Sequence, residues 1–183
     1  MIFVNNPGHG SRVLNTLVLL AVTGVLFFTL VWQALFRVPA CPLCVLQRGA
    51  LVLAGMGLLL NVRLGPSPLH YAMVIGAALA GLAVTGWQIV PQAAAAPDEA
   101  GTLLGLRLYT WALMAFLGLM LFSLLMLALD RKWGDNALKR PVALAGAVVM
   151  GLFLIAVLAS AVGATLDCGF DACAGMAAYH PAS

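Results

Sequence analysis

Five long apolar runs constrain this chain more than any other feature, because each is long enough to cross a lipid bilayer. A helix needs roughly 20 residues to span a hydrocarbon core of about 30 Å. The runs cover approximately residues 13–36, 45–62, 71–90, 108–129 and 142–166. The sequence therefore predicts an all-α, polytopic transmembrane bundle that forms one integral-membrane domain over residues 1–183.

Composition supports a lipid environment for these runs. Hydrophobic residues make up 63% of the chain and charged residues only 8%, whereas a soluble domain carries about 25% charged residues. So few charges cannot cover a surface that faces water. The chain also has no basic stripe that would neutralise phosphates, which excludes a nucleic-acid partner and leaves membrane lipid as the main surrounding.

The distribution of Lys and Arg among the short loops predicts the orientation. If the amino terminus is cytoplasmic, the basic residues on the inner side are Arg12, Arg63, Arg131, Lys132, Lys139 and Arg140. The outer side then carries only Arg37 and Arg107, with Arg48 inside a helix end. We therefore expect a multi-pass protein of a bacterial inner membrane, with the tail at residues 167–183 in the periplasm.

All four cysteines fall on the same predicted face. Cys41 and Cys44 precede the second span, and Cys168 and Cys173 follow the fifth. Topology and cysteine positions are independent observations, so their agreement supports both. The shared face is the oxidising side of a bacterial inner membrane, where disulfides form.

The spacing Cys41-Pro42-Leu43-Cys44 is typical of a redox dithiol, because two intervening residues let the sulfurs meet. Cys44 is at the amino end of a predicted helix, where the helix dipole stabilises a thiolate. Arg48 lies one turn further on the same face. Its cation can hold the thiolate or stabilise negative charge on a quinone oxygen. Alternatively, Arg48 extends to the membrane interface and the cysteines form a structural bridge.

These residues carry a resemblance to a known family. The stretch Cys41-Pro-Leu-Cys-Val-Leu-Gln-Arg48, preceded by Trp32-Gln33 and followed by Pro68-Leu-His-Tyr-Ala-Met-Val-Ile75, resembles the bacterial disulfide bond formation protein B (DsbB) family. The resemblance extends over roughly residues 12–88. It implies a quinone-dependent thiol oxidase with a four-helix core. Its electrons would come from a periplasmic DsbA-like thioredoxin-fold protein and pass to ubiquinone or menaquinone.

The resemblance also implies roles for three matching positions. Cys44 would lie against the quinone and react with it, Cys41 would exchange with the second cysteine pair, and Arg48 would contact the quinone head group. Gln47 stands where some relatives carry an acidic residue, and no role is assigned to it. We expect the first four helices to be nearly antiparallel, with a quinone groove near the outer leaflet.

The chain departs from the family pattern in its second cysteine pair. Family members have four spans and carry that pair between spans three and four, but here the corresponding loop, about residues 91–105, has no cysteine. Cys168 and Cys173 follow an added fifth span instead. Our hypothesis is a relocated shuttle disulfide that takes electrons from the partner and passes them to Cys41 and Cys44. The alternative is a local disulfide that staples the tail.

Two other classes of function remain open at this point. A non-enzymatic membrane scaffold would hold both cysteine pairs as structural disulfides. A zinc protein would use the four sulfurs as ligands. Zinc is disfavoured by the four residues between Cys168 and Cys173 and by the difficulty of keeping thiolates on an oxidising face. We therefore expect no metal site.

Overall fold

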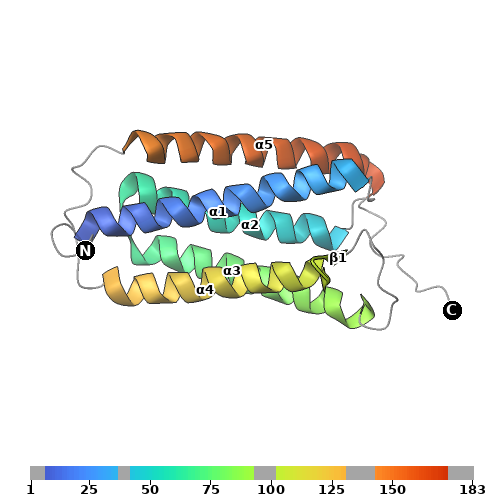
Figure 1. Cartoon of the computed structure of the whole chain (residues 1–183), viewed down its shortest axis with the longest axis horizontal. Coiled ribbons are helices and arrows are strands. Elements are labelled where there is room, and N and C mark those ends of the chain that lie inside the picture. Colours follow the sequence, from blue (N-terminus) through green and yellow to red (C-terminus); the bar gives the residue numbers. More distant parts are fainter. Residues whose placement is uncertain (1–6, 37–41, 93–101, 131–142, 173–183) are drawn as a thin grey trace.

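The computed structural model describes residues 7–36, 42–92, 102–130 and 143–172, and these form a helical bundle with one short hairpin (Figure 1). The helices are α1 (Pro7–Phe36), α2 (Pro42–Leu64), α3 (Pro68–Gln92), α4 (Leu108–Asp130) and α5 (Leu144–Ala172). Each of the five contains a segment long and apolar enough to cross a membrane. The prediction of an all-α, multi-pass membrane bundle is confirmed.

The helices are longer than the apolar runs that predicted them. The largest difference at a carboxyl end is in α5, which continues to Ala172, whereas the predicted span ended at residue 166. No proline interrupts this stretch, so the backbone hydrogen bonds continue past the apolar core. Cys168 therefore lies on helical backbone in the last turns of α5, and not in a tail that begins at residue 167.

Proline and glycine set several helix ends. Helices α1, α2 and α3 each begin with proline, whose missing N–H costs nothing in the first turn. Gly65 ends α2 with a φ of 102° and donates its N–H to the Asn61 carbonyl at 3.1 Å. Glycine commonly ends a helix in this way, because it adopts the left-handed conformation without steric cost. The Ser67 carbonyl then accepts from Tyr71 N at 3.2 Å to start α3, so α2 and α3 form a tight antiparallel pair.

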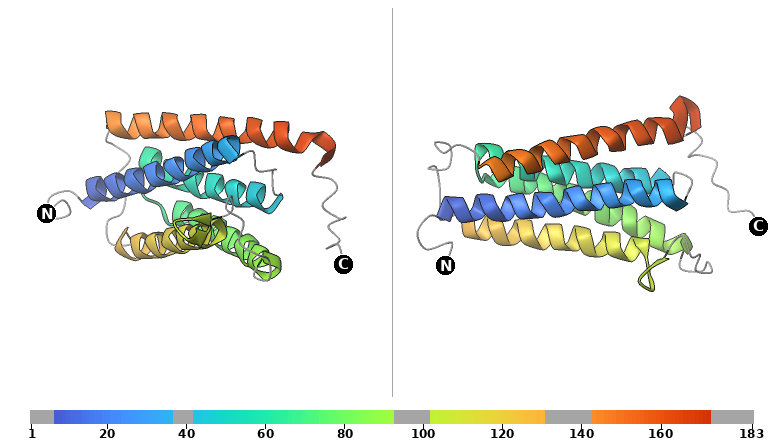
Figure 2. Two further views of the ribbon diagram at one scale, coloured as in Figure 1. Left: turned by 45° about the vertical axis from the view of Figure 1, so that its right-hand side comes forward. Right: turned by 45° about the horizontal axis from the view of Figure 1, so that its top comes forward.

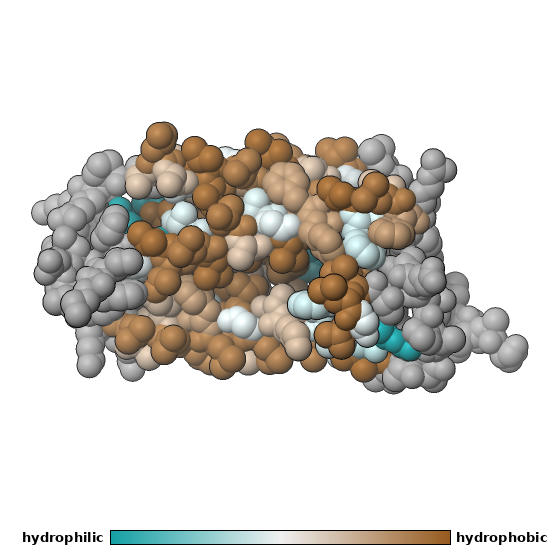
Figure 3. Space-filling view, viewed as in Figure 1, coloured by the Kyte–Doolittle hydropathy of each residue, from teal (hydrophilic) through white to brown (hydrophobic). Residues whose placement is uncertain are grey.

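Helices α2, α3 and α4 pack side by side, while α1 contacts α2 on one side and α5 on the other (Figures 1 and 2). The α5 helix lies outermost, along α1. The space-filling view shows hydrophobic side chains over most of the described helical surface on the face that it presents (Figure 3). An apolar exterior of this kind matches contact with lipid tails.

Close helix contacts depend on glycines, of which Gly81 and Gly55 are examples. A Cβ at Gly81 of α3 would overlap the ring of Phe116 on α4, and a Cβ at Gly55 of α2 would overlap the ring of Phe153 on α5. Both phenylalanines are fully buried. Small residues let membrane helices approach, because van der Waals packing rather than the hydrophobic effect holds helices together in lipid.

A buried polar network joins α1, α2 and α3 at the end of the bundle where α1 begins. The Asn15 amide nitrogen donates to Tyr71 Oη at 2.8 Å, and Asn61 Nδ2 donates to Asn15 Oδ1 at 3.3 Å. His70 Nδ1 lies 3.1 Å from Asn61 Oδ1. Interhelical hydrogen bonds of this kind stabilise helix association in lipid, so the network stabilises the packing of α1, α2 and α3.

The sequence did not indicate the hairpin that precedes α4. Strands β1 (Thr102–Leu103) and β2 (Leu106–Arg107) pair antiparallel through a two-residue turn. Leu104 and Gly105 both have positive φ, at 54° and 77°. Such a turn usually carries Asn-Gly or Asp-Gly, so Leu104 gave no turn signal. Trp111 Nε1 donates to the Leu103 carbonyl at 3.2 Å and ties the hairpin to α4.

Candidate functional site

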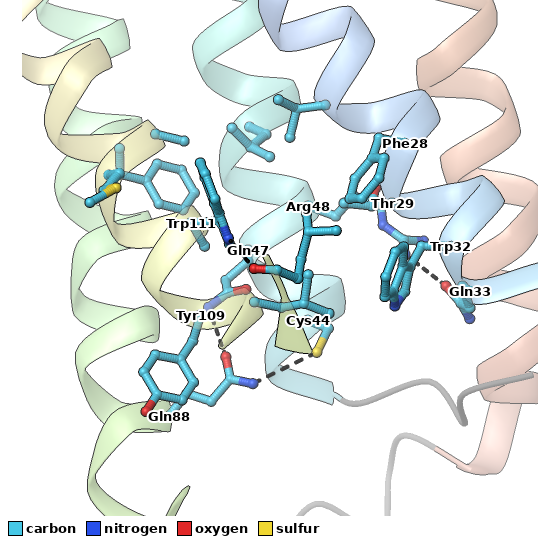
Figure 4. A pocket seen from close by; sticks show the side chains of 18 of the residues that line it. Phe28, Thr29, Trp32, Gln33, Cys44, Gln47, Arg48, Gln88, Tyr109 and Trp111 are labelled. Carbon is cyan, nitrogen blue, oxygen red and sulfur yellow. Dashed lines mark hydrogen bonds between the residues drawn. The ribbon is translucent and has the colours of Figure 1, made fainter. Parts of the chain in front are cut away.

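A pocket of about 600 Å³ lies at the end of the bundle where α2 and α4 begin (Figure 4). Within the described residues α1 and α4 barely contact each other, and the pocket occupies the space between them. Most of its wall is apolar. The lining residues are Val25, Phe28, Thr29, Trp32 and Gln33 of α1; Cys44, Val45, Gln47, Arg48 and Leu51 of α2; Gln88 of α3; Leu103 of β1; and Leu108, Tyr109, Trp111, Ala112, Met114, Ala115 and Phe116 of α4.

Cys44 is half-buried in the first turn of α2 and faces this pocket. The first backbone N–H groups of a helix have no partner within the helix, and together with the helix dipole they favour negative charge nearby. A sulfur in this position is therefore suited to react as a thiolate.

Arg48 enters the same pocket one helical turn further along α2. The prediction that Cys44 and Arg48 share a helix face is thus met by the structure. Arg48 Nη2 donates to Gln33 Oε1 on α1 at 2.7 Å. This bond holds the guanidinium across the gap between α1 and α2.

A group of neutral polar side chains links α2 and α3 beside the pocket. Gln47 Nε2 donates to Thr85 Oγ1 at 3.1 Å and to Gln88 Oε1 at 2.8 Å. Gln88 Nε2 in turn lies 3.9 Å from the Cys44 sulfur (Figure 4). The sequence indicated no role for Gln47, but its amide links α2 to α3 beside the Cys44 sulfur.

The other predicted site residues are only partly placed. Cys41 and Cys173 lie outside the described residues. Cys168 is on the backbone of α5, but its side chain is also outside them. The carboxyl end of α5 and the amino end of α2 lie at the same end of the bundle (Figure 1). Among the described residues, no three His, Cys, Asp or Glu side chains gather as a metal site, and the four-sulfur alternative stays untested.

Sequence reasoning missed the α4 wall of the pocket. Trp111, Tyr109 and Phe116 come from a helix that follows the cysteine motif by more than 60 residues, and no short motif marks them. The aromatic residues at the start of the fourth apolar run were the available signal. Leu103 reaches the pocket through the hairpin, which the sequence did not indicate, so no sequence pattern marked this residue.

The fold and the pocket define a polytopic helical membrane protein with a redox-type cysteine and an arginine facing one apolar pocket. The chain belongs to the DsbB family: residues 11–100 match the family described as disulfide bond formation protein DsbB. The family relation places the chain in disulfide bond formation. No curated protein and no solved structure is a significant match.

The matched residues include nearly all of α1 and the whole of α2 and α3, and end before the hairpin. They therefore contain Cys44, Arg48, Gln33, Gln47 and Gln88. The hairpin, α4 and α5 lie beyond the match, so the second half of the pocket wall and the second cysteine pair are features of this chain outside the family match.

Proposed function

We propose that this protein is a thiol:quinone oxidoreductase that reoxidises a periplasmic, DsbA-like thioredoxin-fold protein and so drives disulfide bond formation. The observation that carries the proposal is that Cys44 and Arg48 face one largely apolar pocket of about 600 Å³. A redox-type cysteine beside a cation, inside a cavity that lipid-soluble molecules can fill, is the arrangement that electron transfer from thiols to a membrane quinone requires.

The pocket residues suit a quinone. Ligand sites of this size usually combine apolar walls with a few polar groups that orient the ligand. Here Trp32, Trp111 and Phe28 supply flat apolar surfaces for a ring, and Arg48 supplies N–H donors for a carbonyl oxygen. A bound quinone, ubiquinone or menaquinone, would accept two electrons and two protons.

The protein's own groups hold and stabilise charge. When the partner's dithiol becomes a disulfide, two electrons and two protons pass to the Cys41–Cys44 pair by thiol–disulfide exchange. The amino end of α2 stabilises the Cys44 thiolate, and the Arg48 guanidinium stabilises negative charge that develops on the acceptor oxygen. The apolar wall excludes water, which strengthens both interactions.

We also propose the orientation derived from the loops, with the amino terminus cytoplasmic and both cysteine pairs periplasmic in a bacterial inner membrane. Arg12 and Arg63 lie at one end of the described bundle, where α4 ends and α5 begins, and Arg131, Lys132, Lys139 and Arg140 come between those two helices in the sequence. The excess of basic residues at this end supports a cytoplasmic location for it. The pocket then faces the periplasmic side.

Replacing Cys44 by serine tests the activity. We expect Cys44→Ser to reduce quinone consumption to background, because serine cannot form the disulfide or carry the electron pair. The measurement is loss of oxidised quinone by purified protein with a reduced thioredoxin-fold partner. Leu46→Ala, on the exposed side of the same turn, should keep the wild-type rate. Quinone consumption by Cys44→Ser at the wild-type rate would disprove the proposal.

The second cysteine pair is proposed to be the shuttle, since α5 ends beside the end of the bundle that holds Cys44 (Figure 1). We expect Cys168→Ser/Cys173→Ser to lose oxidation of the protein partner. Dithiothreitol, a small dithiol that reaches Cys41 and Cys44 directly, should still drive quinone reduction. Oxidation of the protein partner by the double variant at the wild-type rate would support the local staple instead.

A further inference from the structure

Three side chains form a hydrogen-bonded chain from the backbone of α3 to the sulfur of Cys44, and we call Thr85, Gln47 and Gln88 the amide relay. Thr85 Oγ1 donates to the Gly81 carbonyl at 2.7 Å. Gln47 Nε2 donates to Thr85 Oγ1 at 3.1 Å and to Gln88 Oε1 at 2.8 Å. Gln88 Nε2 points at Cys44 Sγ from 3.9 Å (Figure 4).

The direction of this relay follows from its anchor. The oxygen and nitrogen of a glutamine amide are interchangeable in shape, so the surrounding hydrogen bonds must decide which is which. The Gly81 carbonyl can only accept, so it takes the single proton of the Thr85 hydroxyl. The Thr85 oxygen then has only lone pairs left for Gln47, and Gln47 must present its NH₂ group to it.

The same constraint passes to the next residue. Because the Gln47 NH₂ group also faces Gln88, Gln88 must turn its oxygen to Gln47 and its NH₂ group to the sulfur. Two of the three relay residues are buried, since Thr85 is 0% and Gln88 7% exposed. A backbone carbonyl of α3 thus determines that Cys44 receives a hydrogen-bond donor and not an acceptor.

We infer that Gln88 is a positioning residue for the Cys44 sulfur and that Gln47 and Thr85 orient its amide so that an N–H group stabilises the thiolate. A hydrogen bond to the charged form of a group favours that form. The inference rests on the proposed function, in which Cys44 delivers the electrons. It adds a neutral N–H donor from α3 to the effects that the amino end of α2 and the Arg48 cation have on the sulfur.

The groups around the sulfur allow the effect of the Gln88 hydrogen bond to be measured separately from the effects of charge. Among the described residues that line the pocket, those that titrate or carry charge are Cys44 itself, Arg48 of the same helix and Tyr109 of α4. From α3 only the neutral amide of Gln88 lines the pocket. A change at Gln88 or Thr85 therefore alters hydrogen bonding to the sulfur without adding or removing charge.

The test measures Cys44 chemistry in the full chain with Cys41→Ser, Cys168→Ser and Cys173→Ser, so that Cys44 is its remaining thiol. The rate of alkylation by iodoacetamide is followed against pH, without quinone or partner. We expect Gln88→Met, which keeps length but has no donor, to react about tenfold more slowly at neutral pH. The rate plateau at high pH should be unchanged, whereas a steric obstacle would lower that plateau too.

A second variant reverses the relay instead of cutting it. The carboxylate in Gln47→Glu can only accept, so the Gln88 NH₂ group should turn to it and leave an oxygen facing the sulfur. We expect alkylation at neutral pH to be slowed at least as much as in Gln88→Met. A wild-type profile in Gln88→Met would overturn the inference and leave the relay as a contact that only holds α2 and α3 together, because Gln47→Glu also adds a charge whereas Gln88→Met does not.

Threonine provides the matched control. Thr85→Val removes the anchor of the relay and should slow alkylation in the same direction, though less. Thr23 is also buried and also donates to a carbonyl four residues back at 2.7 Å, but it is on α1 and is not part of the amide relay. Thr23→Val should leave the profile unchanged, and an equal effect of both would overturn the inference. Because no quinone is present, failure of the proposed quinone activity would not produce any of these shifts.

Discussion

Arg48→Met is expected to slow quinone reduction by about a hundredfold or more, because one positioned donor to a developing oxyanion contributes roughly that factor. The arginine faces the pocket beside Cys44 and is held toward α1 by its 2.7 Å hydrogen bond to Gln33 Oε1. Methionine keeps the unbranched stem but has neither charge nor N–H groups. The loss should appear in the rate with saturating quinone as well as in the apparent quinone affinity.

The measurement separates the two halves of the reaction. Single-turnover exchange between the reduced partner and the oxidised protein should keep nearly its wild-type rate in Arg48→Met, because the proposed first exchange is with the second cysteine pair and not with Cys44. Arg48→Lys should recover part of quinone reduction, since it restores charge without the planar fork. Arg63→Met, an exposed arginine at the other end of α2, is the control. A wild-type quinone rate in Arg48→Met would remove Arg48 from the site.

Gly81→Ala is expected to lower the free energy of unfolding by about 3 kcal/mol, the upper part of the range for overpacked cores. The added methyl group would overlap the buried ring of Phe116, so α3 and α4 would have to separate. Phe116 also lines the pocket, and quinone reduction should fall with stability. The measurement is unfolding in mixed micelles with increasing sodium dodecyl sulfate, followed by loss of helical circular dichroism.

A matched glycine and a compensating change make this result specific. Gly86 lies further along α3, and a Cβ there would meet nothing within 4 Å, so Gly86→Ala should leave stability nearly unchanged. Gly81→Ala combined with Phe116→Leu should be less destabilised than the sum of the single changes, because the smaller side chain relieves the overlap. Equal effects of Gly81→Ala and Gly86→Ala would contradict the packing account.

The helices were predictable because one physical requirement dominates them. Backbone polar groups in a hydrocarbon core must be satisfied within the segment, so a long apolar run has few alternatives to a helix. Their ends were less predictable. The α5 helix continues through Cys168 to Ala172 after the apolar run has ended. The hairpin before α4 was missed because Leu104 adopts a φ of 54°, which leucine seldom does.

The candidate site also has a part that the sequence predicted and a part that depends on the tertiary structure. Cys44 and Arg48 are four residues apart in one helix, so local geometry alone placed them on a common face. Gln47 and Gln88 are 41 positions apart, and their hydrogen bond exists only because α2 packs against α3. The α4 wall depends in addition on the close approach of Gly81 and Phe116.

Properties set by chain neighbours were therefore contained in the sequence: the membrane spans, the redox spacing of Cys41 and Cys44, and the Cys44–Arg48 face. The pocket with its α4 wall, the bond from Arg48 to Gln33 and the direction of the amide relay came only with the tertiary structure. Helix formation in lipid is decided within a segment, because each backbone group finds its partner one turn away. A pocket and a relay are decided between segments, where small residues and single hydrogen bonds set which faces meet.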